Sequence, residues 1–199
     1  FIDDKNTAKL LDVGCGVGIT TKKLLDDGYN IDGLVPYKWM ADYAKNLTQE
    51  HLKNNKTSIF ECKFEDFTIR KKNQKYDLIF FSESYQYVNM MKSFDVIEKI
   101  LSKNGKIIIF DFFKRDNING ESPLGGGHSI GLFYKLLKEY NYNIKEDIDV
   151  TENLSPNLKL VNDMIVNRLI PFSKTLDQFL YSRNKYVYKF IKWIMKKRI

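Results

Sequence analysis

Short runs of apolar residues alternate with longer stretches of helical periodicity along residues 1–150. The apolar runs predict strands at residues 9–13, 30–35, 58–62, 77–82, 106–112 and 143–150. The periodic stretches predict helices near residues 18–27, 37–53, 90–102 and 129–140. Regular alternation of strands and helices is typical of parallel strands joined by right-handed crossovers. The predicted fold class is therefore α/β, with a doubly wound, mostly parallel sheet.

The C-terminal part of the chain follows a different pattern. A helix is predicted near residues 156–169, and Pro171 is expected to break or kink it. Beyond this proline, apolar residues recur at helical spacing, and four lysines fall on another face of the same helix: Lys185, Lys189, Lys192 and Lys196. We therefore predict a domain of residues 1–151 and a helical, basic extension of residues 152–199 that packs on the same domain.

The net charge of +7 is concentrated in this extension. Residues 168–199 carry nine basic residues and one acid, so this segment has a charge of +8 and the rest of the chain −1. The cationic residues are 27 lysines and 5 arginines, whereas arginine is the side chain that binds phosphates in a bidentate manner. A nucleic-acid partner is therefore disfavoured, and peripheral contact of residues 179–199 with an anionic membrane is an alternative to simple packing of the helix.

The remaining composition limits the class of protein. No apolar run reaches the roughly 18 residues that a membrane-spanning helix needs. The chain has two cysteines, Cys15 and Cys62, and no cysteine or histidine spacing typical of a metal site. A reducing compartment is the simplest expectation, so we predict a cytoplasmic protein, peripheral to a membrane if the basic helix attaches to one, with no metal.

The most specific motif follows the first predicted strand. Residues 12–18 read Asp-Val-Gly-Cys-Gly-Val-Gly and lead into a helix. Alternate glycines allow a sharp turn and close approach of the backbone to a ligand, and the helix that follows directs its first amides at that ligand. The nicotinamide fingerprint needs a third glycine where Ile19 stands, and the Gly-Lys-Ser/Thr of a P-loop is absent. A different cofactor is therefore indicated.

This motif, an acid followed by three alternate glycines, resembles motif I of the class I S-adenosylmethionine-dependent methyltransferases. The resemblance extends over about residues 8–150 and implies a Rossmann-like methyltransferase fold with S-adenosylmethionine as the cofactor. It implies that the cofactor is bound by residues of the glycine loop and of the next three strand ends: Asp12, Gly14, Cys15, Gly16, Gly18, Leu34, Val35, Phe64, Glu65 and Ser82.

The sequence departs from the family pattern at two strand ends. Val35 stands where the family often has an acid that binds the ribose hydroxyls, and Asp32 lies two residues earlier, where we expect it to face elsewhere. After the third predicted strand, Lys63-Phe64 replaces the family's usual Asp-Ala, which implies that the Phe64 amide and Glu65 meet the adenine.

The end of the fourth predicted strand bears on the acceptor. Enzymes of this fold that methylate exocyclic amines of nucleobases typically carry Asn/Asp-Pro-Pro-Tyr/Phe there, whereas residues 82–85 read Ser-Glu-Ser-Tyr. This difference disfavours N-methylation of bases. Together with the loop of residues 125–128, Gly-Gly-Gly-His, the segment is similar to methyltransferases that act on small molecules, of the sterol, tocopherol and amine kind.

Four residues near these loops are candidates for catalysis or substrate binding. A sulfonium methyl group is electrophilic, so the protein has mainly to align the acceptor, exclude water and manage one proton. His128 is the candidate base, and Glu83 is a candidate to hold the cofactor's amino group or the substrate. Tyr85 and Tyr87 are candidates to wall the substrate pocket. The alternatives are a helix-capping histidine, a structural glutamate and tyrosines that pack in the core.

We therefore expect an enzyme that transfers a methyl group from S-adenosylmethionine to a small-molecule acceptor, such as a lipid-like or sugar-derived compound, at oxygen rather than nitrogen. Two alternatives remain. The basic C-terminal helix is compatible with an RNA-modifying methyltransferase, and Val35 and Lys63 are compatible with a non-catalytic scaffold of the same fold.

Overall fold

A computed structural model of the protein describes residue 2 and residues 7–54, 56–67, 75–116, 127–186, 188–189 and 193, without the side chains of residues 157 and 158. The chain divides into two compact units, Phe1–Asn143 and Ile144–Ile199. The first unit holds the sheet, and the second is helical.

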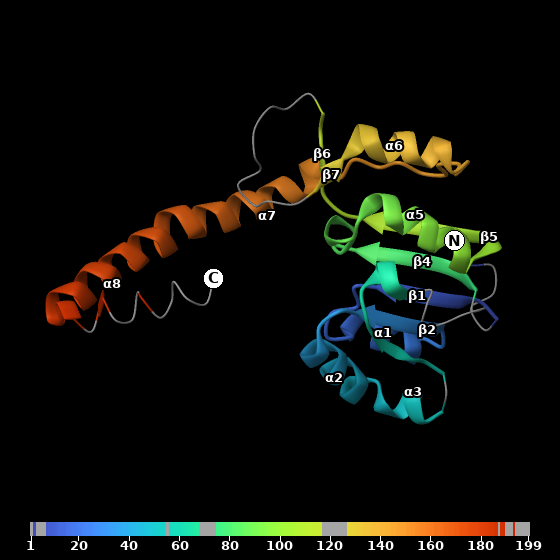
Figure 1. Ribbon diagram of the computed structural model, residues 1–199, viewed down its shortest axis with the longest axis horizontal. Helices are drawn as coiled ribbons and strands as arrows, with labels where there is room; N and C mark the ends of the chain where they lie inside the picture. The colour runs from blue at the N-terminus through green and yellow to red at the C-terminus, as the bar shows by residue number, and fades with distance from the viewer. Residues whose placement is uncertain are drawn as a thin grey trace. The chain divides into compact units, whose positions relative to one another are not determined.

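The first unit is built on a five-stranded parallel sheet of order β3-β2-β1-β4-β5 (Figure 1). Its strands are β1 (Lys9–Val13), β2 (Asn30–Val35), β3 (Ile59–Glu61), β4 (Tyr76–Ser82) and β5 (Leu101–Phe110). The order reverses on either side of β1, which is the doubly wound arrangement that the alternation of strands and helices predicted. The predicted fold class is confirmed.

Helices cover both faces of this sheet. They are α1 (Ile19–Asp26), α2 (Lys38–Leu47), α3 (Gln49–Lys53), α5 (Met90–Ile100) and α6 (Ile130–Glu139), with short 3-10 turns η1 (Phe64–Asp66) and η2 (Tyr85–Tyr87). The single helix predicted at residues 37–53 is divided at Thr48. The Thr48 hydroxyl donates a hydrogen bond to the Ala44 carbonyl at 2.8 Å, a local bond of the kind that bends or ends helices.

Alternate residues of the central strands point into opposite layers of the core. In β4, Ile79 and Phe81 belong to the cluster formed with α5, whereas Leu78 and Phe80 pack with Leu25 of α1. Strands buried on both faces are continuously apolar, so this packing explains the composition of the central strands.

The prediction of a strand at residues 143–150 is wrong. This segment has no regular structure, and its apolar residues Ile144 and Ile148 are exposed. Four of its residues are charged, and no sheet neighbour lies beside it in the described part of the chain. A small parallel sheet forms instead between β6 (Phe113–Lys114) and β7 (His128–Ser129). The five-stranded sheet ends at β5.

Residues 151–183 of the second unit form a continuous helix that changes its hydrogen-bonding pattern part-way along. It consists of α7 (Thr151–Met164), the π-helical segment η3 (Ile165–Leu169) and α8 (Ile170–Arg183). Pro171 lies in the first turn of α8, where a missing amide hydrogen is tolerated, and the wider π turn directly precedes it. The predicted break is therefore a local change of helix type.

No helix among the described residues is long and apolar enough to cross a membrane. Of the segment expected to contact a membrane, residues 179–199, the structure describes residues 179–186, 188, 189 and 193, and Lys192 and Lys196 lie outside the described residues. The peripheral contact and the packing of the extension on the domain therefore stay predictions.

A buried carboxylate joins three strands at the end of the sheet away from the glycine loop. Asp32 on β2 accepts hydrogen bonds from the Lys9 ammonium at 3.0 Å, the Ser58 amide at 2.8 Å and the Tyr76 hydroxyl at 2.9 Å. Burial and the neighbouring negative charge of Asp32 raise the pKa of Tyr76, which keeps this hydroxyl a donor. The expectation that Asp32 faces away from the cofactor loop is confirmed.

Replacing Asp32 by alanine should destabilise the fold strongly. The variant leaves the buried Tyr76 hydroxyl and the half-buried Ser58 amide without their acceptor, and removal of one partner from a buried ionic network typically costs about 3–5 kcal/mol. Chemical denaturation measures the change in the free energy of unfolding. Asp42→Ala removes an exposed pair with Lys38 and should leave the midpoint where it is; equal midpoints for the two variants would contradict the structural role of Asp32.

Candidate functional site

The glycine loop between β1 and α1 adopts backbone conformations that glycine favours. Gly14, Gly16 and Gly18 have φ angles of 82°, 56° and 84°. The amides of Gly14 and Cys15 donate hydrogen bonds to the Leu34 carbonyl at 2.8 and 3.1 Å, which ties the loop to the end of β2. The loop is therefore a fixed turn at the carboxyl edge of the sheet, where doubly wound folds bind ligands.

The three glycines have different surroundings. A Cβ atom at Gly14 would overlap the Ser84 side chain, and one at Gly18 would lie 2.9 Å from the Cβ of Ala44. At Gly16 nothing lies within 4 Å of this position. The first and third glycines thus permit close packing within the protein, whereas Gly16 borders open space in which a ligand can approach the backbone.

Two side chains of this loop region, those of Asp12 and Cys15, are buried in the protein. Asp12 is buried and accepts a hydrogen bond from the Thr21 hydroxyl at 2.7 Å, which joins β1 to α1. Burial is the main cause that raises the pKa of Asp12 to about 6. Burial also raises the pKa of the Cys15 thiol to about 12, so Cys15 is a packing residue rather than a nucleophile. Cofactor contacts from these residues would come through the backbone.

The end of β2 is apolar, as the departure from the family pattern implied. Leu34 is buried and contributes its carbonyl oxygen to the glycine loop. Val35 is buried in a cluster with Cys15, Ala41 and Ala44. The next residues along the chain bring Tyr37, which is 61% exposed, to the start of α2. Tyr37 was not among the predicted site residues, and its only sequence signal is an aromatic residue directly after a strand.

The turn after β3 places Phe64 in the core and Glu65 beside the backbone at the start of α5. Phe64 is buried and packs edge-on against Phe81, with ring centroids 5.2 Å apart. Glu65 is half-buried, and its carboxylate accepts a hydrogen bond from the Asn89 amide at 2.8 Å. The implied adenine contacts of Phe64 and Glu65 stay predictions.

The residues after β4 form the centre of the candidate site. Ser82 is exposed at the end of the strand, and Glu83 is exposed with a left-handed backbone, φ 55°. This conformation is uncommon for a residue other than glycine and costs about 1–2 kcal/mol, so neighbouring contacts must hold it. Ser84 is buried against Gly14 and donates its hydroxyl hydrogen to the Val13 carbonyl. The segment therefore lies directly beside the glycine loop.

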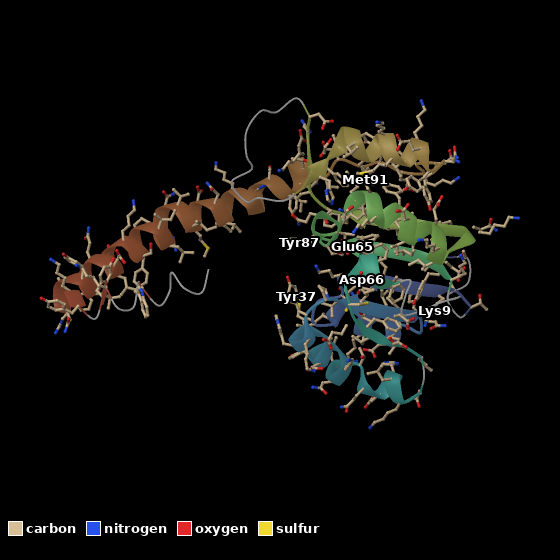
Figure 2. The ribbon with its side chains drawn as sticks, viewed as in Figure 1. Lys9, Tyr37, Glu65, Asp66, Tyr87 and Met91 are labelled. Atoms are coloured by element: carbon tan, nitrogen blue, oxygen red, sulfur yellow. The ribbon has the colours of Figure 1, made fainter. Side chains whose placement is uncertain are left out.

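The two predicted substrate-binding tyrosines have opposite environments. Tyr85 is fully buried, and its hydroxyl lies 3.0 Å from the Ser93 hydroxyl. Burial raises its pKa to about 12. Tyr87 is 80% exposed; Figure 2 shows it with Tyr37 and Glu65 at one edge of the sheet. Of the two, Tyr87 is the side chain that is accessible to a substrate, and Tyr85 packs in the core.

His128 on β7 lies against Tyr85. Its Nε2 is 3.0 Å from the Tyr85 carbonyl oxygen, and the two rings meet edge to face at 5.4 Å. A carbonyl oxygen only accepts, so Nε2 carries the hydrogen and Nδ1 of a neutral ring is the nitrogen able to accept a proton. The N-cap of α6 is Ser129, whose hydroxyl accepts from the Leu132 amide, so His128 is not the capping residue. Gly125 and Gly126 lie outside the described residues.

The described residues contain no group of three histidine, cysteine, aspartate or glutamate side chains placed to hold a metal ion. What the site combines is an open backbone position at Gly16, a half-buried histidine and an exposed aromatic residue around the carboxyl ends of β1 and β4. This combination can bind a cofactor through the backbone and accept a proton.

Comparison with known proteins places this arrangement in a family. Residues 11–109 match the family model described as Methyltransferase domain, Methyltransf_11. Probable polyketide synthase 22 of Dictyostelium discoideum is 27% identical over 203 aligned residues, which cover 93% of this chain and 8% of that protein. The ubiquinone biosynthesis O-methyltransferase of Pelagibacter ubique is 28% identical over 83% of this chain and 75% of that enzyme.

A solved structure shares the fold. The geranyl diphosphate C-methyltransferase of Streptomyces coelicolor superposes with a TM-score of 0.65 and 16% identity, over 75% of this chain and 59% of that one. The sheet order and the glycine loop define a Rossmann-like methyltransferase domain. With the family match, the chain belongs to the class I S-adenosylmethionine-dependent methyltransferases. The open space beside Gly16 fits the cofactor of this family.

Asp12 predicts an unusual dependence of stability on pH. Its pKa is about 6 in the folded protein against 3.8 for an ordinary carboxyl group, so the folded state binds the proton more tightly. The contribution of Asp12 to the free energy of unfolding is therefore largest below pH 4 and falls by about 3 kcal/mol as the pH rises through 6. Asp12→Asn should remove this fall, and denaturation at pH 4 and pH 7 measures it. The exposed Asp27→Asn serves as the control; a parent-like profile in Asp12→Asn would refute the assignment.

Gly16 and Gly28 offer a matched pair of substitutions. Both have positive φ angles, 56° and 91°, and neither has an atom within 4 Å of a built Cβ. Alanine at either position should cost about 1–2 kcal/mol of stability. Only Gly16 is a predicted cofactor-binding residue, so Gly16→Ala alone should weaken S-adenosylhomocysteine binding, about tenfold or more in calorimetric titration. Parent-like binding by Gly16→Ala would show that the ligand does not approach this backbone.

Proposed function

We propose that this chain transfers the methyl group of S-adenosylmethionine to a small lipid-like or polyketide-like acceptor, at oxygen rather than nitrogen. The observation that carries the proposal is the open backbone position at Gly16 facing the carboxyl edge of the sheet, with His128 oriented by the Tyr85 carbonyl at that same edge. The names of the similar proteins support the acceptor class, because they refer to a polyketide, to ubiquinone and to geranyl diphosphate.

The cofactor would be held mainly by backbone groups. Gly16 and its neighbours in the glycine loop line the open space, and the amides at the start of α1 favour a carboxylate there. The strand ends at Val35, Phe64, Glu65 and Ser82 would complete the site. When bound, the cofactor supplies an electrophilic methyl group.

The protein's own residues would align the acceptor and remove its proton. His128 accepts the hydroxyl proton at Nδ1, while its Nε2–H bond to Tyr85 fixes the ring. Glu83 hydrogen-bonds the acceptor or the cofactor's amino group, and Tyr87 covers the acceptor's apolar part. An amine acceptor would have less need of a base, since its lone pair attacks directly, and this favours oxygen.

Neither alternative has comparable support. An RNA-modifying enzyme would depend on the nine basic residues of segment 168–199, of which Lys192, Lys196, Lys197 and Arg198 lie outside the described residues. A non-catalytic scaffold has no need of an open glycine position between two close-packed ones.

Replacing His128 by alanine should slow methyl transfer to oxygen about 100-fold or more, the usual contribution of a positioned base. Labelled methyl transfer from S-adenosylmethionine to an alkyl catechol, a β-keto acyl thioester and an alkyl amine measures reaction at oxygen, carbon and nitrogen. The label should enter the catechol and not the amine. His51→Ala is the control, because His51 pairs with Asp26 beside α1. Absence of S-adenosylhomocysteine binding by the parent would overturn the proposed function.

A further inference from the structure

The segment of residues 83–89, between β4 and α5, is held by hydrogen bonds from several parts of the chain. The Glu83 amide donates to the Phe110 carbonyl at 2.8 Å. The Gln86 amide donates to an Asp111 carboxylate oxygen at 3.0 Å, and the Asn89 amide to Glu65 at 2.8 Å. Two carboxylates from other segments thus bind the backbone of this one.

Asp111 bridges two loops. Its second oxygen accepts the Phe112 amide at 2.8 Å, so the carboxylate is engaged on both sides by backbone groups. A residue with both oxygens occupied in this way is suited to fixing the distance between the end of β5 and the segment 83–89.

Glu65 completes a helix cap from outside the helix. Asn89 is the N-cap of α5 and accepts the Lys92 amide at 3.0 Å, but its own amide needs an acceptor. In a capping box, the side chain of the third helical residue accepts the hydrogen bond from the N-cap amide. Here that residue is Lys92, whose ammonium group cannot accept a hydrogen bond. Glu65 supplies the acceptor from the turn after β3.

These anchors determine what the segment presents to the site. Between them lie Glu83, with its left-handed backbone, and the exposed Tyr87. Ser84, in the same segment, packs against Gly14. A strained conformation persists only where surrounding contacts hold it, and Asp111, Glu65 and the Phe110 carbonyl are those contacts.

We propose that Asp111 and Glu65 are positioning residues, which hold segment 83–89 so that Glu83 and Tyr87 face the cofactor and acceptor without themselves touching the reacting atoms. This inference rests on the proposed methyl transfer. It distinguishes Asp111 and Glu65, whose carboxylates bind backbone amides, from Glu83, whose side chain is exposed.

The test compares Asp111→Ala with Asp111→Asn and Asp77→Ala. Asp77 is a matched control, because its carboxylate also bridges two segments, at the Lys9 amide and the Ser102 hydroxyl, but at the opposite end of β4. Asp111→Ala should speed hydrogen exchange in segment 83–89 about tenfold, because a backbone amide loses its acceptor. Asparagine keeps an acceptor oxygen and should restore most of the protection.

Ligand binding gives a second readout that needs no acceptor. S-adenosylhomocysteine should slow exchange of segment 83–89 in the parent and in Asp77→Ala, and this slowing should be lost in Asp111→Ala. In turnover, Asp111→Ala should lower kcat about tenfold or more with a smaller change in KM, while Asp77→Ala keeps the parent's kcat. Glu65→Ala should likewise speed hydrogen exchange at the Asn89 amide and lower kcat. Glu65→Gln keeps an acceptor oxygen and should restore most of both.

The outcomes separate the two proposals. Unchanged exchange in Asp111→Ala, equal loss of turnover in Asp77→Ala, or failure of Asp111→Asn to restore protection would each overturn the positioning role. A parent that does not bind S-adenosylhomocysteine would overturn the proposed function instead, while the exchange comparison without ligand would still decide whether Asp111 holds the segment.

Discussion

The packing of Ser84 against Gly14 is the contact on which the candidate site depends. A side chain at position 14 would overlap Ser84, so the glycine loop and the segment after β4 can approach each other only because this residue is glycine. The Gly14 and Cys15 amides are bound to the Leu34 carbonyl on the other side. The loop is thus fixed between the ends of β2 and β4, and Gly16 is left beside open space.

Buried or bridging carboxylates connect neighbouring segments at both ends of the sheet, with a different role at each end. Asp32 and Asp77 hold strands together at the end away from the glycine loop. Asp12, Glu65 and Asp111 hold the elements that surround the candidate site. The acids at one end stabilise the fold, whereas those at the other restrict the conformations of short segments, which is what preorganised binding requires.

The comparisons agree with this picture at the level of family and fold. The chain spans 8% of the length of the similar polyketide synthase and 75% of that of the ubiquinone biosynthesis O-methyltransferase. The apolar end of β2 is the clearest departure from the family pattern. Val35 is packed against Cys15 and Ala44, and recognition of a ribose there would have to come from backbone or from a neighbouring side chain such as that of Tyr37.

The sequence by itself determined the strands of the central sheet and the glycine loop, because apolar periodicity and glycine spacing are local properties of the chain. It also indicated that Val35 stands where the family often has a ribose-binding acid, and that Asp32 faces away from the glycine loop. It failed at residues 143–150, where a strand would need a neighbour that only tertiary structure provides. The burial of Tyr85, the ring orientation of His128 and the anchoring roles of Asp111 and Glu65 were likewise decided in three dimensions. Each depends on a partner 24 or more residues away in the chain, such as the Phe113 ring, the Tyr85 carbonyl or the Gln86 and Asn89 amides.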